Sequence, residues 1–335
     1  MSLRSFLLKR IAYTVLLIFF VILLNWVIFE AMPGVSGNLY QILGQSGRLG
    51  PAQYHRQIEL YGLDKPYWER FVDYFKAMIT FQFGFSYQSN TDVTTELIQQ
   101  GTLFNTLELL GTATLMAIII GVFLGILVSR KRGSALDNFW VTSSLTTFSL
   151  PTFFMGILLI FIFSSTLNWF PAGGIAPSIW NNASLNAKPD ILGQIVVRLQ
   201  YLFLPALTLT LFSYGGFLLL TRATMGEALS DDYILTARAK GLSERTILVK
   251  HAFKNASLPV ITSSALAFGS ILSGAIITET IFNWPGLGFW LYGAVLSKDF
   301  PVMQALFYII ALSVIAANFI SDILYGIVDP RIKYE

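Results

Sequence analysis

Several apolar runs in this chain are long enough to cross a lipid bilayer, and they limit the possible folds more than any other feature. A transmembrane helix needs about 20 mainly apolar residues. Of the 335 residues, 54% are hydrophobic and only 12% are charged, whereas a typical soluble domain carries about 25% charged residues. The mean hydropathy of the chain is +0.63. The sequence therefore predicts an all-α polytopic membrane protein.

We expect six transmembrane helices. The predicted spans are Ile11–Phe29, Leu103–Val128, Phe139–Leu167, Leu199–Leu220, Val260–Phe282 and Val302–Val328. The first run is longer than a signal-peptide core of about 7–15 residues, so we expect it to be retained. Pro151 lies inside the third span and could kink it, and Pro259 is expected to open the fifth.

The spans divide the chain into four parts. Residues 1–34 form the N-terminus and the first helix, 35–101 a large extracellular segment, 102–329 the transmembrane core, and 330–335 a tail. In the extracellular segment a short helix is predicted at Ala52–Tyr61, and Pro66 is expected to begin an amphipathic helix. The apolar residues of that second helix recur at helical spacing and are Trp68, Phe71, Val72, Phe75, Met78 and Ile79. We expect this helix to pack on the other helices or to lie on the membrane.

The distribution of basic residues predicts the orientation of the helices, because cytoplasmic loops are enriched in Lys and Arg. Three basic residues lie in 1–10, three at 130–132, six in 222–254 and two at the C-terminus, which makes fourteen of the 22. These four segments fall on one side of a six-helix arrangement. Both termini and the loop 223–258 are therefore predicted to be cytoplasmic.

The loop 223–258 contains the longest polar and basic interruption of the second half, Asp231–Pro259. The sequence predicts a helix at Tyr233–Lys240, which Gly241 can end in a left-handed conformation. Ser243 can cap the next helix, whose apolar face is expected to consist of Ile247, Leu248, Ala252 and Phe253, with the basic side chains of Arg245, Lys250 and Lys254 pointing elsewhere.

Two interpretations of this loop follow from the pattern. The small residues Ala237, Ala239 and Gly241 would let a partner surface approach closely. Alternatively, the basic residues bind anionic lipid headgroups.

The sequence argues against several kinds of chemistry. Cysteine is absent and the two histidines, His55 and His251, are expected on opposite sides of the membrane. No Gly-Lys-Ser/Thr of a phosphate-binding loop occurs.

An intramembrane enzyme would need a metal cluster or a Ser–His pair within the membrane, so we rank this alternative last. A secondary active transporter would be expected to show internal repeats and midplane ion sites, and we find no repeat and few central charges.

Three carboxylates lie in or near the predicted spans: Glu108, Glu279 and Asp322. Charged groups at membrane depth are costly and usually face a cavity or a partner. Glu279 and Asp322 are candidates for lining a transport pathway, and the alternative is hydrogen bonding within the helix bundle. Gly121 and Gly125 are spaced to allow close helix packing.

The basic loop resembles the EAA loop of ABC importer permeases. The matching residues are Ala237, Arg238, Ala239, Lys240, Gly241 and Leu242, followed by His251-Ala252, Asn255-Ala256 and Pro259. More narrowly, the chain resembles the B-type permease subunit of the dipeptide/oligopeptide/nickel importer family over nearly its whole length. The other matching segments are Met32-Pro33-Gly34, Tyr61–Pro66, Arg132-Gly133-Ser134 with Asp137, Ser149-Leu150-Pro151, Thr278-Glu279 to Phe282, Pro285–Gly288, Asp299, Asp322, Tyr325 and Asp329-Pro330-Arg331.

The chain departs from the family pattern at two places. Leu235 stands where the glutamate of the EAA loop is expected. After Pro33-Gly34, Val35 replaces an acidic residue and Ser36 replaces a proline.

The resemblance implies a transport subunit without catalysis of its own, in the cytoplasmic membrane of a prokaryote. It implies partnership with a second homologous permease, with two cytoplasmic ATPases that bind ATP and Mg, and with an extracellular solute-binding protein. Residues Ala237–Leu242 would then be the coupling helix that contacts an ATPase. The binding protein would dock on loops around Trp169–Asp190 and Asn283–Asp299, with 35–101 as a possible addition. No cofactor bound by this chain and no nucleic acid are expected.

Overall fold

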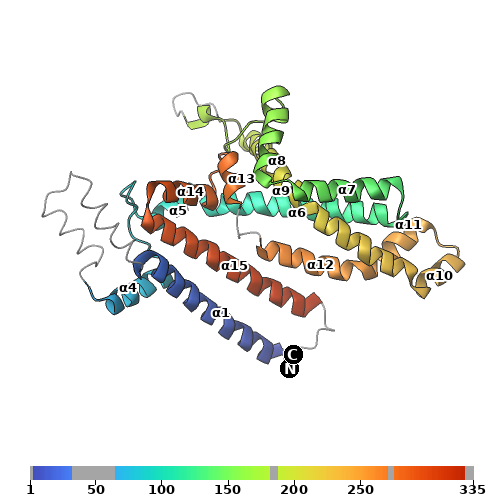
Figure 1. Cartoon of the computed structure of the whole chain (residues 1–335), viewed down its shortest axis with the longest axis horizontal. Helices are drawn as coiled ribbons and strands as arrows, with labels where there is room; N and C mark the ends of the chain where they lie inside the picture. The colour runs from blue at the N-terminus through green and yellow to red at the C-terminus, as the bar shows by residue number, and fades with distance from the viewer. Residues whose placement is uncertain (1–2, 32–64, 182–187, 271–274, 329–335) are drawn as a thin grey trace. The chain divides into compact units, whose positions relative to one another are not determined.

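The computed structural model describes residues 3–31, 65–181, 188–270 and 275–328 (Figure 1). The chain divides into two compact units. One consists of Met1–Gly101, Trp290–Ile315 and Tyr334–Glu335, and the other of Thr102–Phe289 and Ala316–Lys333. The described residues form helices and one isolated β-bridge between Phe85 and Asp92. The all-α prediction is confirmed for this part of the chain.

The first unit begins with the N-terminal helix. Its elements are α1 (Leu3–Trp26), the π-helical turn η1 (Val27–Ala31), α4 (Tyr67–Ile79), α5 (Val93–Gln100), most of α14 (Leu287–Ser297) and the first half of α15 (Phe300–Val328). Pro66 is the N-cap of α4, so the helix begins at Tyr67, one residue later than predicted. The Phe71 ring lies 5.2 Å from that of Trp26, and Phe75 lies 6.1 Å from Phe19. These contacts support the packing interpretation of the amphipathic helix, although Trp68 on it is 68% exposed. The predicted helix Ala52–Tyr61 lies outside the described residues.

The second unit contains the other helices. In chain order they are α6 (Thr102–Ser129), α7 (Ala135–Ser149), α8 (Thr152–Leu159), η2 (Ile160–Thr166), η3 (Ser178–Asn181), α9 (Ile191–Ser230), α10 (Asp232–Ala239), α11 (Glu244–Thr246), η5 (Ile247–Ala252), α12 (Phe253–Ser270) and α13 (Ile276–Ile281).

Helices α6 and α9 make the closest packing in the second unit, and two glycines explain it. A Cβ atom on Gly121 would lie 2.5 Å from the carbonyl oxygen of Tyr214, and one on Gly125 would lie 2.6 Å from Cβ of Thr221. Real Cβ atoms do not approach that closely, so only glycine lets the two backbones meet here. The predicted close packing at Gly121 and Gly125 is therefore confirmed.

Gly125→Ala is expected to destabilise the chain, because the added methyl group must push α6 away from α9. Overpacking of this kind typically costs about 1–3 kcal/mol. Gly111→Ala is the matched control in the same helix, since its Cβ would meet nothing within 4 Å. Thermal unfolding of the two purified variants in detergent measures the difference, and equal melting temperatures would contradict this account of the packing.

Four described helices are long and apolar enough to cross a membrane, or five if one bent pair is counted as a single span. The four are Leu8–Phe29, Thr102–Ser129, Ile191–Ser230 and Phe300–Ile320. They contain all or most of the first, second, fourth and sixth predicted spans, although the fourth helix extends beyond Leu199–Leu220 at both ends.

The third predicted span, Phe139–Leu167, is not a single rod. Helix α7 and the following helical segment, Thr152–Thr166, meet at an angle of 105°. Leu150 has an extended backbone, with φ −79° and ψ 135°, because the ring of Pro151 disfavours a helical conformation for the residue before it. The kink predicted at Pro151 is therefore a sharp break.

The prediction for the fifth span, Val260–Phe282, is wrong at its start, whereas its predicted end lies one residue beyond Ile281, the last residue of α13. Pro259 lies inside α12 and does not open it. The described part of α12 ends at Ser270, residues 271–274 lie outside the described residues, and α13 is a separate helix that starts after Ala275.

Candidate functional site

The basic loop folds as the short helix α10 and a second helical segment, joined by a glycine turn. The second segment begins at Glu244 and continues through η5 into α12. Gly241 has φ +75°, in the left-handed region that glycine adopts without strain. Its amide N–H donates to the carbonyl of Arg238 at 2.9 Å, and the amide of Leu242 donates to that of Ala237 at 3.4 Å. This pair of bonds is the Schellman ending of a helix. The predicted left-handed end at Gly241 is confirmed, and so is the cap at Ser243, whose hydroxyl accepts from the Thr246 amide.

The inner face of this loop is an apolar cluster that includes the end of α9. Its buried members are Met225, Ala228, Ile234, Ala237, Ile247, Leu248, Ala252 and Ala256, with Phe253 packed against them. The predicted apolar face of the second segment is confirmed, and Arg245, Lys250 and Lys254 are exposed as expected. Ala237 is only 5% exposed, so the expectation that its small size lets a partner approach is wrong. It lets α10 pack onto its own chain.

The outer face of the loop, which consists of Leu235 and Arg238–Leu242, is exposed. Leu235 is 69% exposed and Leu242 is 37% exposed. The Arg238 guanidinium donates from Nε to Oε1 of Glu244 at 3.1 Å, and both side chains are at least half exposed. An exposed pair of this kind adds little stability. The outer face thus exposes leucine side chains, a small alanine and basic groups, without the glutamate expected at Leu235.

Glu279 is completely buried. Its Oε1 accepts from the Thr106 hydroxyl at 2.8 Å, and its Oε2 accepts from the amide of Phe289 at 3.0 Å. The same hydroxyl accepts from the amide of Leu287 at 2.8 Å. A Cβ on Gly286 would overlap the Glu279 carboxylate, so glycine is required there. This geometry supports the interpretation of Glu279 as a bundle-internal hydrogen-bonding group that fixes segment 283–289, which includes the start of α14.

Glu108 belongs to a neighbouring polar group at the same end of α6. It is paired with Arg198 of α9, whose Nε donates to Oε2 at 3.0 Å. The Arg198 guanidinium also donates to Asn105 and lies over the Trp284 ring, 4.6 Å from its centroid. A cavity of about 410 Å³ opens beside this pair, with walls that include Ile175 and Trp180. Glu108 is therefore a partner of Arg198 rather than an isolated carboxylate.

Asp322 lies in α15, and its side chain is outside the described residues, as is His55. Among the described residues, no group of three or more His, Asp or Glu side chains could hold a metal ion.

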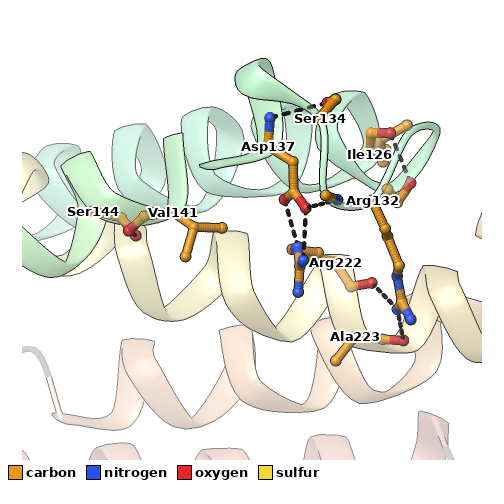
Figure 2. A network of polar contacts seen from close by, with 10 residues as sticks. Ile126, Arg132, Ser134, Asp137, Val141, Ser144, Arg222 and Ala223 are labelled. Carbon is orange, nitrogen blue, oxygen red and sulfur yellow. Dashed lines mark hydrogen bonds and ion pairs between the residues drawn. The ribbon is translucent and has the colours of Figure 1, made fainter. Parts of the chain in front are cut away.

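A third polar cluster ties the turn after α6 to the end of α9, and Figure 2 shows it. Asp137 of α7 is fully buried and receives two hydrogen bonds from Arg222, at 2.6 and 2.7 Å. Arg132 donates to the carbonyls of Arg222 and Ala223 at 2.8 and 3.2 Å. Sequence reasoning noted Arg132 and Asp137 but assigned no partner to Asp137. The sequence feature that could have identified this partner is Arg222, an arginine that follows a predicted apolar span.

Comparison with known proteins identifies the kind of chain that carries these features. The family described as the binding-protein-dependent transport system inner membrane component matches residues 97–334. The chain belongs to this family. It is the permease component of an ABC importer, a non-catalytic membrane subunit that functions together with another permease, ATPases and a binding protein.

Individual permeases resemble the chain over almost its full length. It is 35% identical to the di/tripeptide transport system permease protein DppB of Pseudomonas aeruginosa (strain UCBPP-PA14), with 99% of both chains covered. It is 33% identical to the dipeptide permease DppB of Escherichia coli (strain K12), again over 99% of both. It is 34% identical to the oligopeptide permease AppB of Bacillus subtilis (strain 168), over 98% of this chain and 99% of the relative.

Proposed function

We propose that this importer permease carries peptide-like solutes, with dipeptides and oligopeptides as the first candidates. The similarity over the full length to permeases named for di/tripeptide, dipeptide and oligopeptide transport carries this proposal. The solute would arrive on an extracellular binding protein and pass between this chain and a second homologous permease. Two cytoplasmic ATPases would supply the energy by binding ATP and Mg, and this chain would bind no cofactor.

The proposed topology has six transmembrane helices in a prokaryotic cytoplasmic membrane, with both termini in the cytoplasm. The bent pair of α7 and Thr152–Thr166 would be the third span, and α12 with α13 the fifth. The basic segments at 130–132 and 222–254 favour this orientation.

The outer face of the loop is the proposed contact with an ATPase. Arg238, Ala239, Lys240, Gly241 and Leu242 are exposed there, while Ala237 supports them from the buried side. The hydrogen-bonded turn at Gly241 favours this role, because a coupling element must keep its shape when force is applied to it. Segments 35–101, 169–190 and 283–299 remain the proposed docking regions for the binding protein, and Asp322 remains a candidate for the pathway.

Co-purification tests the assembly directly. A C-terminal tag and gentle extraction from native membranes are expected to recover a second permease and two ATPase subunits with this chain. Peptides eluted from a retained binding protein and identified by mass spectrometry would support the substrate class. Reproducible isolation of the chain as a lone homo-oligomer in several detergents would contradict the assembly and favour a secondary active transporter.

A further inference from the structure

We propose that Arg132, Asp137 and Arg222 are positioning residues that transmit movement of the basic loop to α6 and α7. This inference rests on the proposed contact between the loop and an ATPase. We call these three residues the clamp. Its contacts bring together the turn after α6, the start of α7 and the last turns of α9 (Figure 2).

The ionic part of the clamp joins α7 to α9. Asp137 has 0% exposure, and its Oδ1 and Oδ2 accept from Nε and Nη2 of Arg222 at 2.6 and 2.7 Å. Oδ2 also accepts from the amide of Gly133 at 2.8 Å. A two-point pair between a planar guanidinium and a carboxylate fixes orientation as well as distance. The two helices therefore cannot slide or rotate against each other here without breaking charged hydrogen bonds.

The second part of the clamp joins the turn to the backbone of α9. Arg132 donates through Nη2 to the carbonyl oxygens of Arg222 and Ala223. Its guanidinium occupies the space that a side chain at position 226 would need, since a Cβ on Gly226 would overlap the guanidinium atoms. Glycine at this position thus lets the arginine reach the helix backbone.

The clamp lies next to the core of the loop. Met225 and Ala228, which follow Arg222 on α9, are buried in the same apolar cluster as Ile234 and Ala237 of α10. At a rise of about 1.5 Å per residue, Arg222 and Met225 are separated by less than one helical turn. A displacement of α10 must therefore move the part of α9 that is hydrogen-bonded to Arg132 and Asp137.

The contacts continue along α6 beyond the clamp. The close approach at Gly121 and Gly125 fixes α6 against Tyr214–Thr221 of α9. The loop, the end of α9, α6 and the start of α7 are thereby connected by packed side chains and hydrogen bonds, which are the physical means by which coupling travels. The clamp is the only charged connection between α7 and α9 among the described residues.

The test uses the assembled transporter and two single-cysteine reporters, because the natural chain has no cysteine. One reporter is Val249→Cys on the exposed side of η5, and the other is Leu145→Cys on the exposed side of α7. Each cysteine is first coupled to a spin label in detergent, because a thiol at position 145 would face the membrane if α7 belongs to the third span. The electron paramagnetic resonance spectrum of each label is then measured with and without Mg-ATP. Each reporter is combined with Gly226→Ala, which displaces Arg132, or with Asp137→Asn.

In the parent chain the spectra of both labels are expected to change on addition of Mg-ATP. With Gly226→Ala or Asp137→Asn, the change at position 249 is expected to persist, while the change at position 145 falls about tenfold. Gly216→Ala is the matched control on α9, since its Cβ would meet nothing within 4 Å, and it is expected to leave both changes intact.

An unchanged response at position 145 in both variants would overturn the proposal and leave the clamp with a purely structural role. So would a parent chain in which position 249 responds and position 145 does not. Gly226→Ala keeps the test decisive if Asp137→Asn fails to fold, because a flexible arginine can move away from the new methyl group. Failure of the proposed function is distinguishable, since then no ATPase co-purifies and neither reporter responds in the parent chain.

Discussion

Ala239→Glu is expected to abolish solute uptake while the chain still inserts into the membrane and folds. Ala239 is exposed at the end of α10, on the outer face of the loop between Arg238 and Lys240. A long carboxylate there would prevent close approach and would bury a charge against the ATPase. Disruption at the centre of an interface costs at least about 2 kcal/mol, which corresponds to about 30-fold weaker binding. Uptake of a labelled dipeptide into cells, with the chain's abundance measured by immunoblot, gives the result.

The control for this prediction is Ala239→Ser, which changes the chemistry slightly and keeps the residue small. It is expected to transport at a rate close to that of the parent chain. A further variant, Leu235→Glu, places an acidic group where the family's glutamate is expected and tests whether the outer face tolerates charge there. Normal uptake by Ala239→Glu would show that this face is not the ATPase contact, and the interaction with lipid headgroups would then be favoured.

Glu279→Ala is expected to destabilise the chain more than Gly125→Ala does. The Thr106 hydroxyl and the Phe289 amide would lose the acceptor that the fully buried Glu279 carboxylate now provides. Buried donors without partners and the remaining cavity together cost about 2–5 kcal/mol. The measurement is thermal unfolding of the purified chain, together with protease sensitivity of segment 283–289. Glu279 would be a pathway residue instead if the variant kept its stability and lost only transport.

Further substitutions separate the role of the carboxylate from general damage. Glu279→Gln keeps the volume and one acceptor oxygen, so it is expected to destabilise less than Glu279→Ala. Gly288→Ala would place its Cβ 2.7 Å from the backbone of Ile276 and 3.0 Å from Oε2 of Glu279, and it is expected to destabilise the chain. Gly293→Ala has open space around its Cβ and should not do so.

The sequence predicted those features of the fold that depend on local chemistry. The left-handed end at Gly241 and the cap at Ser243 follow from the properties of single residues. Long apolar runs such as Leu103–Val128 predicted helices because a run of this length and composition can cross a membrane as a helix. The close approach at Gly121 and Gly125 was foreseeable from their spacing.

The parts that the sequence did not predict depend on packing. Pro151 and Pro259 both lie within or next to a predicted apolar span, but their structural effects differ. Pro151 follows Leu150, which has an extended backbone, and the helix breaks there. Pro259 lies inside α12. In α12, the neighbouring Ala256 and Val260 are buried, and this packing helps offset the hydrogen bond that Pro259 lacks. The apolar cluster around Ile247 likewise determines which face of α10 is buried. The sequence alone therefore did not predict that Ala237 is buried.

Only part of the candidate site was predicted, because the rest of it also depends on packing between distant parts of the chain. The exposed residues Arg238–Leu242 were identified from their resemblance to a known loop, whereas pairings between residues far apart in the chain carry no local signal. Arg222 and Asp137 are 85 residues apart, and Glu279 and Thr106 are 173 apart. Only the folded chain shows that these polar groups satisfy one another.

The contact between Arg132 and Gly226 has a consequence for how these chains evolve. Any side chain at position 226 would occupy the space that the arginine guanidinium now fills. A homologue that acquires a larger residue there must therefore shorten or redirect the side chain at position 132, and one that loses the arginine is free to lose the glycine. The two positions, although distant in the sequence, should consequently vary as a pair within the family.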